Sequence, residues 1–134
     1  MKVTFVVPPN YSALDDRLEP HLGLLYMAAV LLENNYEVEY CDLEGVPKER
    51  WAVPGRDVYA STVYGVTLNN ARKLAALCKR QNPQGLVVIG GPQVSGYADQ
   101  TLRLDPNFDC AVVFEGEFSL LEAIRDWGEK RIYQ

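Results

Sequence analysis

The sequence has few residues of the kinds that build metal centres or disulfide frameworks. Among its 134 residues are one histidine and three cysteines, and the cysteines form no CxxC pair or CxxxCxxC cluster. A multi-histidine metal site and a self-contained iron–sulfur site are therefore excluded. The odd number and wide spacing of the cysteines also argue against a disulfide framework. We interpret them as small buried hydrophobic residues, with Cys41 and Cys110 in strands and Cys78 on a helix.

The sequence also lacks an excess of positive charge and any long apolar run. Thirteen Lys and Arg residues against eighteen Asp and Glu residues give a formal net charge of −5 at pH 7. Nucleic acids and anionic membrane surfaces attract basic proteins, so neither is expected as a partner. The longest apolar stretch, residues 22–32, is too short to span a bilayer, and the apolar N-terminal segment is too short for a signal peptide. We therefore expect a cytoplasmic protein.

What the sequence contains instead is an alternation of strand-like and helix-like segments. The expected strands are residues 2–7, 37–42, 58–63, 86–89 and 108–114, and the expected helices are residues 22–34, 68–81, 97–104 and 118–127. Such alternation predicts a parallel sheet with helices on both faces. We expect a single α/β domain over residues 1–134, with a flavodoxin-like (Rossmann-like), doubly wound, five-stranded sheet in the order 2-1-3-4-5. The first helix is apolar nearly all round, so its outer side is expected to meet a partner domain or a ligand.

Ligands of such sheets bind beyond the carboxyl ends of the strands, so the residues that follow each strand are candidates for a binding site. Ser61 and Thr62 leave space there and offer hydroxyl groups, and the neighbouring Thr67 suits the N-cap of the next helix. Residues 90–91 are both glycine, so the backbone can approach a bulky ligand or simply turn. Glu115 can accept hydrogen bonds from a ligand or favour the start of the following helix. Binding and purely structural interpretations remain open at all three places.

Several common chemistries are missing from these strand ends. Neither a GxGxxG nor a GxxxxGK[ST] motif occurs, so the phosphate cradles of dinucleotide-binding and P-loop proteins are absent. No pairing of a nucleophile with a base is visible either. An enzyme that acts alone is therefore the weakest interpretation.

Taken together, these segments resemble the cobalamin-binding domain at the N-terminus of cobalamin-dependent radical S-adenosylmethionine (SAM) enzymes. The matching stretches occur in the family's order along almost the whole chain and are residues 6–10, 20–29, 36–38, 42–43, 61–63, 87–92 and 115–117. Flavodoxin-like cobalamin-binding domains carry three motifs. Residues 61–63 resemble the SxL element and residues 90–91 the GG element, whereas the DxHxxG loop is missing. Further departures are Gln93, where the family often has histidine, and Phe114, where it often has glycine.

The resemblance implies where the cofactor binds. The nucleotide tail of cobalamin would enter a pocket beside Ser61 and residues 90–91, and the corrin ring would lie over the strand ends. The cobalt would be base-off, without a protein histidine on its lower face, and His21 is the alternative cobalt ligand. The residues implied to bind the cofactor are Asn10, Ser61, Thr62, Tyr64, Gly90, Gly91, Pro92, Gln93 and Glu115.

The resemblance also implies a partner. The family continues into a barrel whose CxxxCxxC motif holds the [4Fe–4S] cluster that cleaves SAM. We expect that cluster and SAM in a radical SAM domain, in cis or in trans. The implied function is a cobalamin-binding module, without catalytic residues of its own, that serves a radical SAM methyltransferase-type enzyme. The alternative is a cofactor-free interaction or substrate-recognition domain, which a cavity filled by Tyr64 or Tyr97 would favour.

Overall fold

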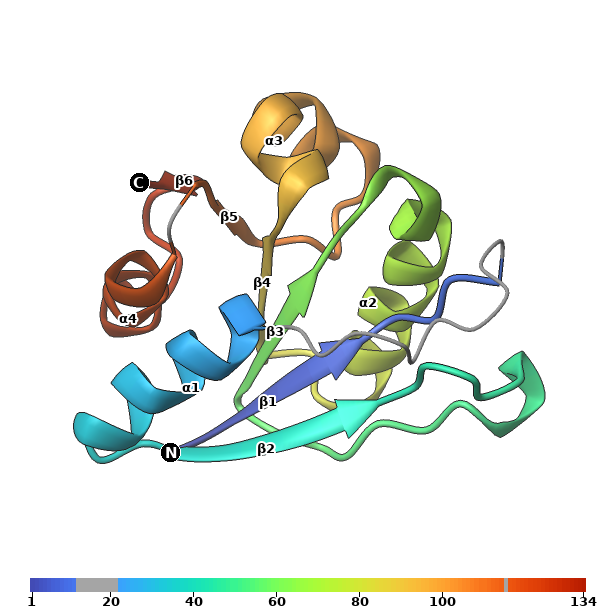
Figure 1. Cartoon of the computed structure of the whole chain (residues 1–134), viewed down its shortest axis with the longest axis horizontal. Coiled ribbons are helices and arrows are strands. Elements are labelled where there is room, and N and C mark those ends of the chain that lie inside the picture. Colours follow the sequence, from blue (N-terminus) through green and yellow to red (C-terminus); the bar gives the residue numbers. More distant parts are fainter. Residues whose placement is uncertain (12–21, 115) are drawn as a thin grey trace.

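A parallel β-sheet forms the centre of the chain in the computed structural model, which describes residues 1–11, 22–114 and 116–134. The strands are ordered β2-β1-β3-β4-β5-β6 and every neighbouring pair is parallel, so their carboxyl ends share one edge of the sheet (Figure 1). Short apolar runs suit strands that are covered on both faces. The strands are β1 (Lys2–Val7), β2 (Glu37–Asp42), β3 (Val58–Thr62), β4 (Leu86–Gly90), β5 (Cys110–Val112) and β6 (Ile132–Tyr133).

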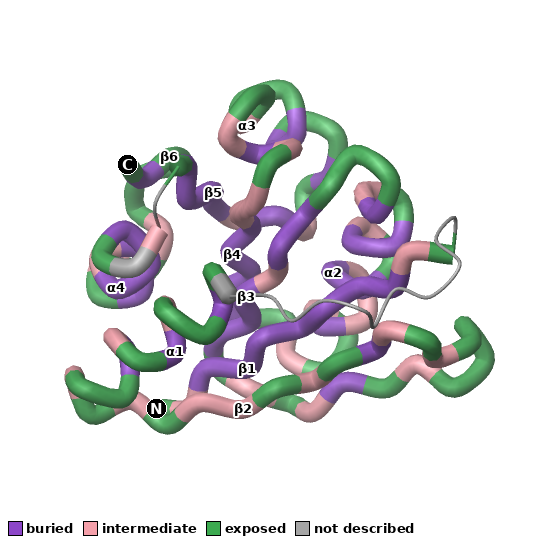
Figure 2. Tube along the Cα trace, viewed as in Figure 1, coloured by how far each residue is buried: buried purple, intermediate pink, exposed green. Residues whose placement is uncertain are grey.

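Helices cover both faces of the sheet (Figure 1). They are α1 (Leu22–Glu33) and α4 (Glu117–Asp126) on one face, and α2 (Leu68–Gln81) and α3 (Pro92–Leu104) on the other, with short 3₁₀ turns η1 (Lys48–Arg50) and η2 (Gly65–Thr67). Val58 and Ala60 join the apolar cluster under α1 and α4, whereas Tyr59 joins the cluster under α2 and α3, because successive strand residues face opposite sides. Figure 2 shows the central strands buried and the edge strand β2 more exposed. No helix in the described ranges is long and apolar enough to cross a membrane.

The sheet confirms the expected flavodoxin-like order and adds one strand to it. The first five strands follow the order 2-1-3-4-5, and β6 extends the sheet beyond β5. The expectation of five strands was therefore wrong by one. A two-residue strand is too short to show a hydrophobic period, so β6 leaves no signal in the sequence. β5 is shorter than the expected 108–114, because its pairing with β4 and β6 involves only residues 110–112.

The third helix begins five residues earlier than the sequence analysis expected, at Pro92 rather than Tyr97. Gly91 turns the chain with a φ of 101°, and Pro92 then occupies the first helical position, where its missing N–H is harmless. Tyr97 itself has non-helical angles (φ −142°, ψ 47°) and marks a kink. Because of this kink, the sequence pattern of α3 resembles a loop followed by a short helix. The start of α3 at Pro92 places Gln93 in the first helical turn.

The three cysteines lie in the expected elements. Cys41 is in β2, Cys78 on α2 and Cys110 in β5. Cys78 and Cys110 are buried, and burial raises the pKa of each of these thiols to about 12. Cys41 is half-buried, and burial together with the nearby Glu39 and Asp42 raises its pKa as well. In the described part of the chain, no group of three or more His, Cys, Asp or Glu side chains is placed to hold a metal ion.

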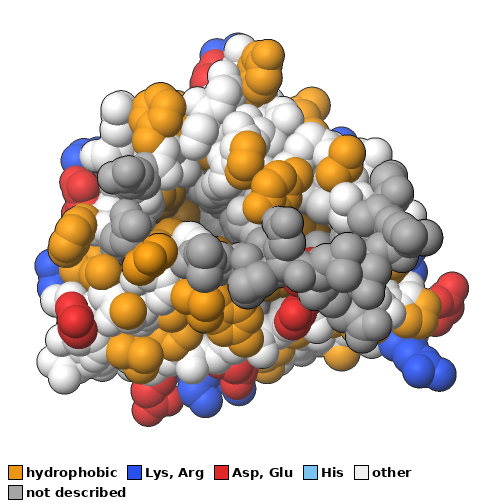
Figure 3. Space-filling view, viewed as in Figure 1, with side chains coloured by type: hydrophobic (Ala, Val, Ile, Leu, Met, Phe, Trp, Pro, Cys, Tyr) orange, Lys and Arg blue, Asp and Glu red, His pale blue; other side chains and the backbone are white. Residues whose placement is uncertain are grey.

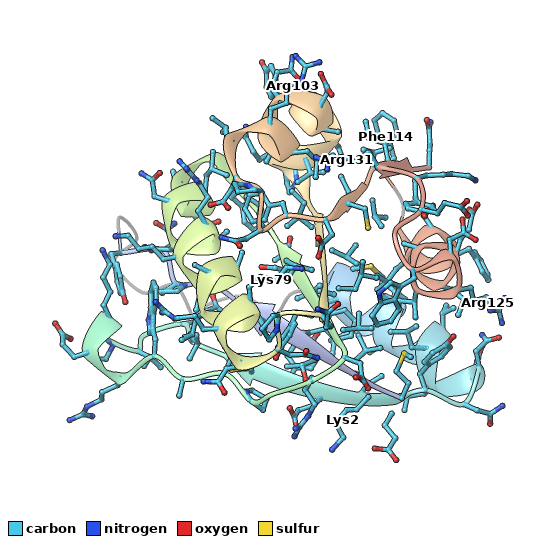
Figure 4. All side chains as sticks on the ribbon, turned by 180° about the vertical axis from the view of Figure 1, so that it is seen from behind. Lys2, Lys79, Arg103, Phe114, Arg125 and Arg131 are labelled. Atoms are coloured by element: carbon cyan, nitrogen blue, oxygen red, sulfur yellow. The ribbon has the colours of Figure 1, made fainter. Side chains whose placement is uncertain are left out.

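At the amino edge of the sheet, Asp109 links α2 to the strands. Its Oδ2 accepts hydrogen bonds from Lys79 Nζ (2.6 Å) and from the backbone N–H of Val87 (2.8 Å). Lys79 Nζ also donates to the carbonyl oxygen of Gly85 (2.7 Å). Figure 4 shows Lys79 between α2 and the sheet. The Lys79 and Asp109 side chains are only 20% and 30% exposed, so this pair is better shielded from water than an ordinary surface ion pair.

We expect Asp109→Ala to lower the free energy of unfolding by about 2 kcal/mol, because it leaves a backbone N–H without its acceptor and the Lys79 ammonium group without its ionic partner. Asp99→Ala is the matched control, since Asp99 pairs with Arg103 (2.9 Å) on the solvent-exposed side of α3. The control should lose less than about 0.5 kcal/mol. Urea denaturation of the three proteins measures the difference, and equal losses would contradict this role of Asp109.

Candidate ligand-binding site at the carboxyl ends of the strands

A cavity of about 360 Å³ lies at the carboxyl ends of β3, β4 and β5, against helices α1 and α4. Figure 3 shows a hollow bordered by hydrophobic side chains near the middle of this face. Tyr64 is the only titratable residue among the described residues that line the cavity, so its wall is neutral and mainly apolar. The lining residues are Gly23, Leu24 and Met27 of α1, residues 60–62, 64 and 88–92 at the ends of β3 and β4, and Val112, Phe114, Gly116 and Leu120 of β5 and α4.

Gly91 brings the end of β4 unusually close to the end of β3. A Cβ atom at Gly91 would lie 2.6 Å from Thr62 Oγ1 and 2.9 Å from both the nitrogen and the oxygen of Val63. The backbone N–H of Val63 donates to the carbonyl oxygen of Gly90 (2.7 Å), and the N–H of Gln93 donates to that of Val63 (3.2 Å). Only glycine allows this approach, because the space is occupied and the φ of 101° disfavours any side chain. The two glycines therefore form a side-chain-free part of the cavity wall.

Thr62 and Ser61 present their side chains to opposite faces of the sheet. Ser61 is in register with Val6 and Ile89, and both belong to the apolar cluster under α2 and α3. The Ser61 hydroxyl is buried and has no hydrogen-bond partner in the described structure. Thr62 follows Ala60 on the face of α1 and α4, which is the face of the cavity. The wall's hydroxyl is therefore that of Thr62, although the sequence analysis treated both residues as candidates.

The turn after β3 is held by Thr67, which the sequence analysis expected to cap α2. Its Oγ1 accepts a hydrogen bond from the N–H of Tyr64 (3.0 Å) and donates to the Tyr64 carbonyl oxygen (3.3 Å). The Thr67 side chain makes no cap hydrogen bond to α2. Thr67 thus fixes the position of Tyr64, which lines the cavity and is 38% exposed.

The remaining expected residues divide into those at the cavity and those beside it. Gly90 and Pro92 line the cavity, together with Gly91 and Tyr64. Asn10 and Gln93 follow β1 and β4 as expected but do not line it, and Gln93 instead lies against the 65–67 turn. Glu115 and His21 lie outside the described residues, so their proposed roles stay predictions.

Gly116 and Met27 are two of the wall residues that were not among the expected site residues. A Cβ atom at Gly116 would lie 2.8 Å from Val112 Cγ1 and 3.2 Å from Met27 Sδ, so glycine lets the start of α4 approach α1. Met27 itself lines the cavity. Nothing in the sequence distinguishes Met27 from an ordinary core residue. The position of Gly116 just before a helix was the one available signal.

The arrangement suits the binding of a ligand better than catalysis. Among the described lining residues, none offers an acid, an amine, an imidazole or a thiol that could transfer a proton or attack a substrate. The volume is in the range of small-molecule pockets, and an apolar wall with a few polar groups is their usual character. A partly apolar, neutral portion of a ligand fits this description.

Known proteins resemble the chain in sequence and in fold. Residues 17–124 match the model of the family described as the B12 binding domain. An uncharacterized methyltransferase of Pyrococcus horikoshii, PH0819, is 27% identical over an alignment 136 residues long. The alignment covers 92% of this chain and 29% of that protein. The chain thus spans less than a third of this curated relative.

Solved structures share the fold. TsrM of Kitasatospora setae, a radical S-adenosylmethionine methyltransferase solved with tryptophan and a SAM analogue, has a TM-score of 0.73 at 18% identity. That likeness covers 92% of this chain and 25% of TsrM. The N-terminal domain of the hypothetical protein TM0182 of Thermotoga maritima has a TM-score of 0.59 at 19% identity, covering 87% of this chain and 94% of that domain.

We expect Gly91→Ala to lower the free energy of unfolding by about 2–4 kcal/mol, because the new methyl group collides with β3 and the φ is unsuited to alanine. Gly96→Ala on α3 is the control, since a Cβ atom there meets no atom within 4 Å. The control should leave stability unchanged or raise it by up to about 1 kcal/mol. Thermal and urea unfolding report both values, and a silent Gly91→Ala would contradict the close approach of β3 and β4.

Proposed function

Because the chain belongs to the B12-binding domain family, we propose that it is a module that holds cobalamin at the carboxyl ends of β3, β4 and β5. In this proposal the nucleotide tail occupies the cavity, and the corrin ring lies over the strand ends. The bound cofactor supplies a cobalt centre that carries a methyl group or relays an electron. The chain's own residues bind and orient it.

The single observation that carries the proposal is the open, neutral cavity bounded by Gly90 and Gly91. The planar aromatic base of the tail needs a flat, apolar slot, and the missing side chains leave room for one. The Thr62 hydroxyl forms no hydrogen bond with another described residue and is on the cavity face, where it can bond a polar atom of the tail. The residues that would hold the tail and the ring edge are Thr62, Tyr64, Gly90, Gly91 and Pro92.

We further propose a base-off cofactor without a protein histidine on the lower face of the cobalt. The described lining residues contain no imidazole. His21 is the only histidine of the chain and remains the alternative ligand. Asn10 and Glu115 stay as proposed neighbours of the ring edge, and Gln93 stays as a proposed contact of the tail and ring. Ser61 contributes to the wall without offering its hydroxyl.

The partner we propose is a radical SAM domain, in cis or in trans, that supplies the [4Fe–4S] cluster and SAM. The chain matches 29% of the curated methyltransferase and 25% of TsrM, so both relatives carry much additional polypeptide. Leu25, Tyr26 and Leu32 on the outer side of α1 are 49%, 63% and 58% exposed, which offers such a domain an apolar surface.

The alternative, a cofactor-free interaction or substrate-recognition domain, would be favoured by a cavity filled with aromatic side chains. Tyr97 is 58% exposed and does not line the cavity, and Tyr64 lines it without closing it. This observation favours the cofactor-binding function.

Titration of the purified chain with hydroxocobalamin tests the proposal directly. We expect saturable binding with the visible spectrum of a base-off corrinoid. Gly90→Leu should abolish binding by filling the tail channel, whereas Gly96→Leu, a matched change on α3, should not affect it. A His-on spectrum that disappears in His21→Ala would contradict the histidine-free cobalt. Absence of binding by the wild-type chain would contradict the proposed function itself.

The two neighbouring hydroxyl groups give a second test. We expect Thr62→Val to weaken cobalamin binding about five- to tenfold, because it removes a hydrogen bond from the cavity wall while keeping the side chain's shape. Ser61→Ala should leave the dissociation constant unchanged and leave the fold as stable or slightly more stable, because it removes an unpaired buried hydroxyl. Calorimetric titration measures both, and weaker binding by Ser61→Ala alone would reverse the assignment.

A further inference from the structure

Phe114 combines an unfavourable backbone conformation with an unfavourable exposure. Its φ is 61°, in the left-handed region, which a bulky residue rarely adopts. The residue is also 67% exposed, although it carries a large aromatic ring. Figure 4 shows it at the rim of the molecule, near the turn between β5 and α4.

The other described non-glycine residues with positive φ have a structural explanation that Phe114 lacks. Asn35 (φ 66°) follows α1 and Trp127 (φ 54°) follows α4, and a left-handed residue is the usual way to end a helix. Phe114 follows a strand instead. Its conformation must therefore be maintained by its surroundings for some other reason.

The contacts around Phe114 maintain this conformation. The backbone N–H of Phe114 donates to Ser95 Oγ on α3 (2.8 Å), and the preceding N–H, of Val113, donates to the carbonyl oxygen of Tyr133 (2.9 Å). The turn is thus tied to α3 on one side and to β6 on the other. The ring, in contrast, gains little from the fold, because most of it remains in water.

The position of the ring suggests what covers it. Phe114 lines the same cavity as Gly90, Gly91 and Thr62, but at its exposed mouth. Phe118, also strongly exposed, is helical and does not line the cavity. A strained turn that holds an aromatic ring at the mouth of a cavity is a feature of ligand-binding sites rather than of stable folds.

We propose that Phe114 is a cofactor contact whose ring packs against the edge of the bound corrin macrocycle. The inference rests on the proposed function and adds to it a residue, because the strained turn then serves binding at the expense of the free protein's stability. The macrocycle, and not the tail, is the partner, since the tail occupies the deeper part of the cavity beside Gly90.

The test uses opposite signs of two measurements on Phe114→Gly. Glycine suits a φ of 61°, so the melting temperature of the cofactor-free chain should rise by about 3 °C. The dissociation constant for hydroxocobalamin should increase about tenfold, because the apolar ring no longer covers the macrocycle. Phe114→Leu keeps the strain and part of the apolar contact, so its dissociation constant should lie between those of the wild type and Phe114→Gly.

Asn35→Gly is the matched control, because it relaxes a left-handed residue that does not line the cavity. It should leave the dissociation constant unchanged. The proposal is overturned if Phe114→Gly binds as tightly as the wild type, or if it lowers the melting temperature, since the ring would then support the fold itself. A wild-type chain that binds no hydroxocobalamin overturns both this proposal and the proposed function, whereas unaltered binding by Phe114→Gly overturns only this one.

Discussion

The close contact between the ends of β3 and β4 is the constraint on which the rest of the site depends. Val63 donates to Gly90 across 2.7 Å, and Gly91 leaves no room for a side chain beside Thr62. This contact sets the direction in which the chain leaves β4, and therefore where Pro92 starts α3. It also leaves a stretch of bare backbone at the sheet edge where a fold of this kind receives its ligand. A single pair of glycines thus links the course of the chain to the shape of the cavity.

The cavity and the sheet divide the chemistry of the protein in a simple way. The charged side chains described in ion pairs lie away from the cavity, as with Asp109 and Lys79 at the amino edge. The cavity itself contributes hydroxyl groups, glycine backbone and apolar side chains. The described lining residues offer no acid, amine, imidazole or thiol to change the protonation of a ligand, so in the proposed function the reactivity is that of the cofactor and of the partner domain. The family assignment and the short span of the chain within its relatives agree with this division.

Much of the fold could be predicted from the sequence, because each central strand is a short apolar run and most helices carry a distinct apolar face. The prediction failed where the signal is shorter than the period that reveals it, as in β6, or interrupted by a kink, as at Tyr97 in α3. The sequence pointed to the strand ends at which the cavity lies, but it could not show which hydroxyl faces that cavity. Ser61 and Thr62 are adjacent, and only the pairing register decides which of them faces the cavity. Met27 could not be predicted, because a cavity-lining apolar residue looks like a core residue.

The burial of the thiols has a consequence for the proposed function, in which the bound cofactor carries a methyl group. Thiolates are strong nucleophiles toward such groups, and a thiol reacts through its ionised form. Cys78 and Cys110 are buried with pKa values of about 12, and the pKa of Cys41 is also raised. None of the three lines the cavity. In the proposed function, a methyl group on the cobalt would therefore meet no thiol of this chain among the described residues of the cavity wall, where the one sulfur is the uncharged thioether of Met27.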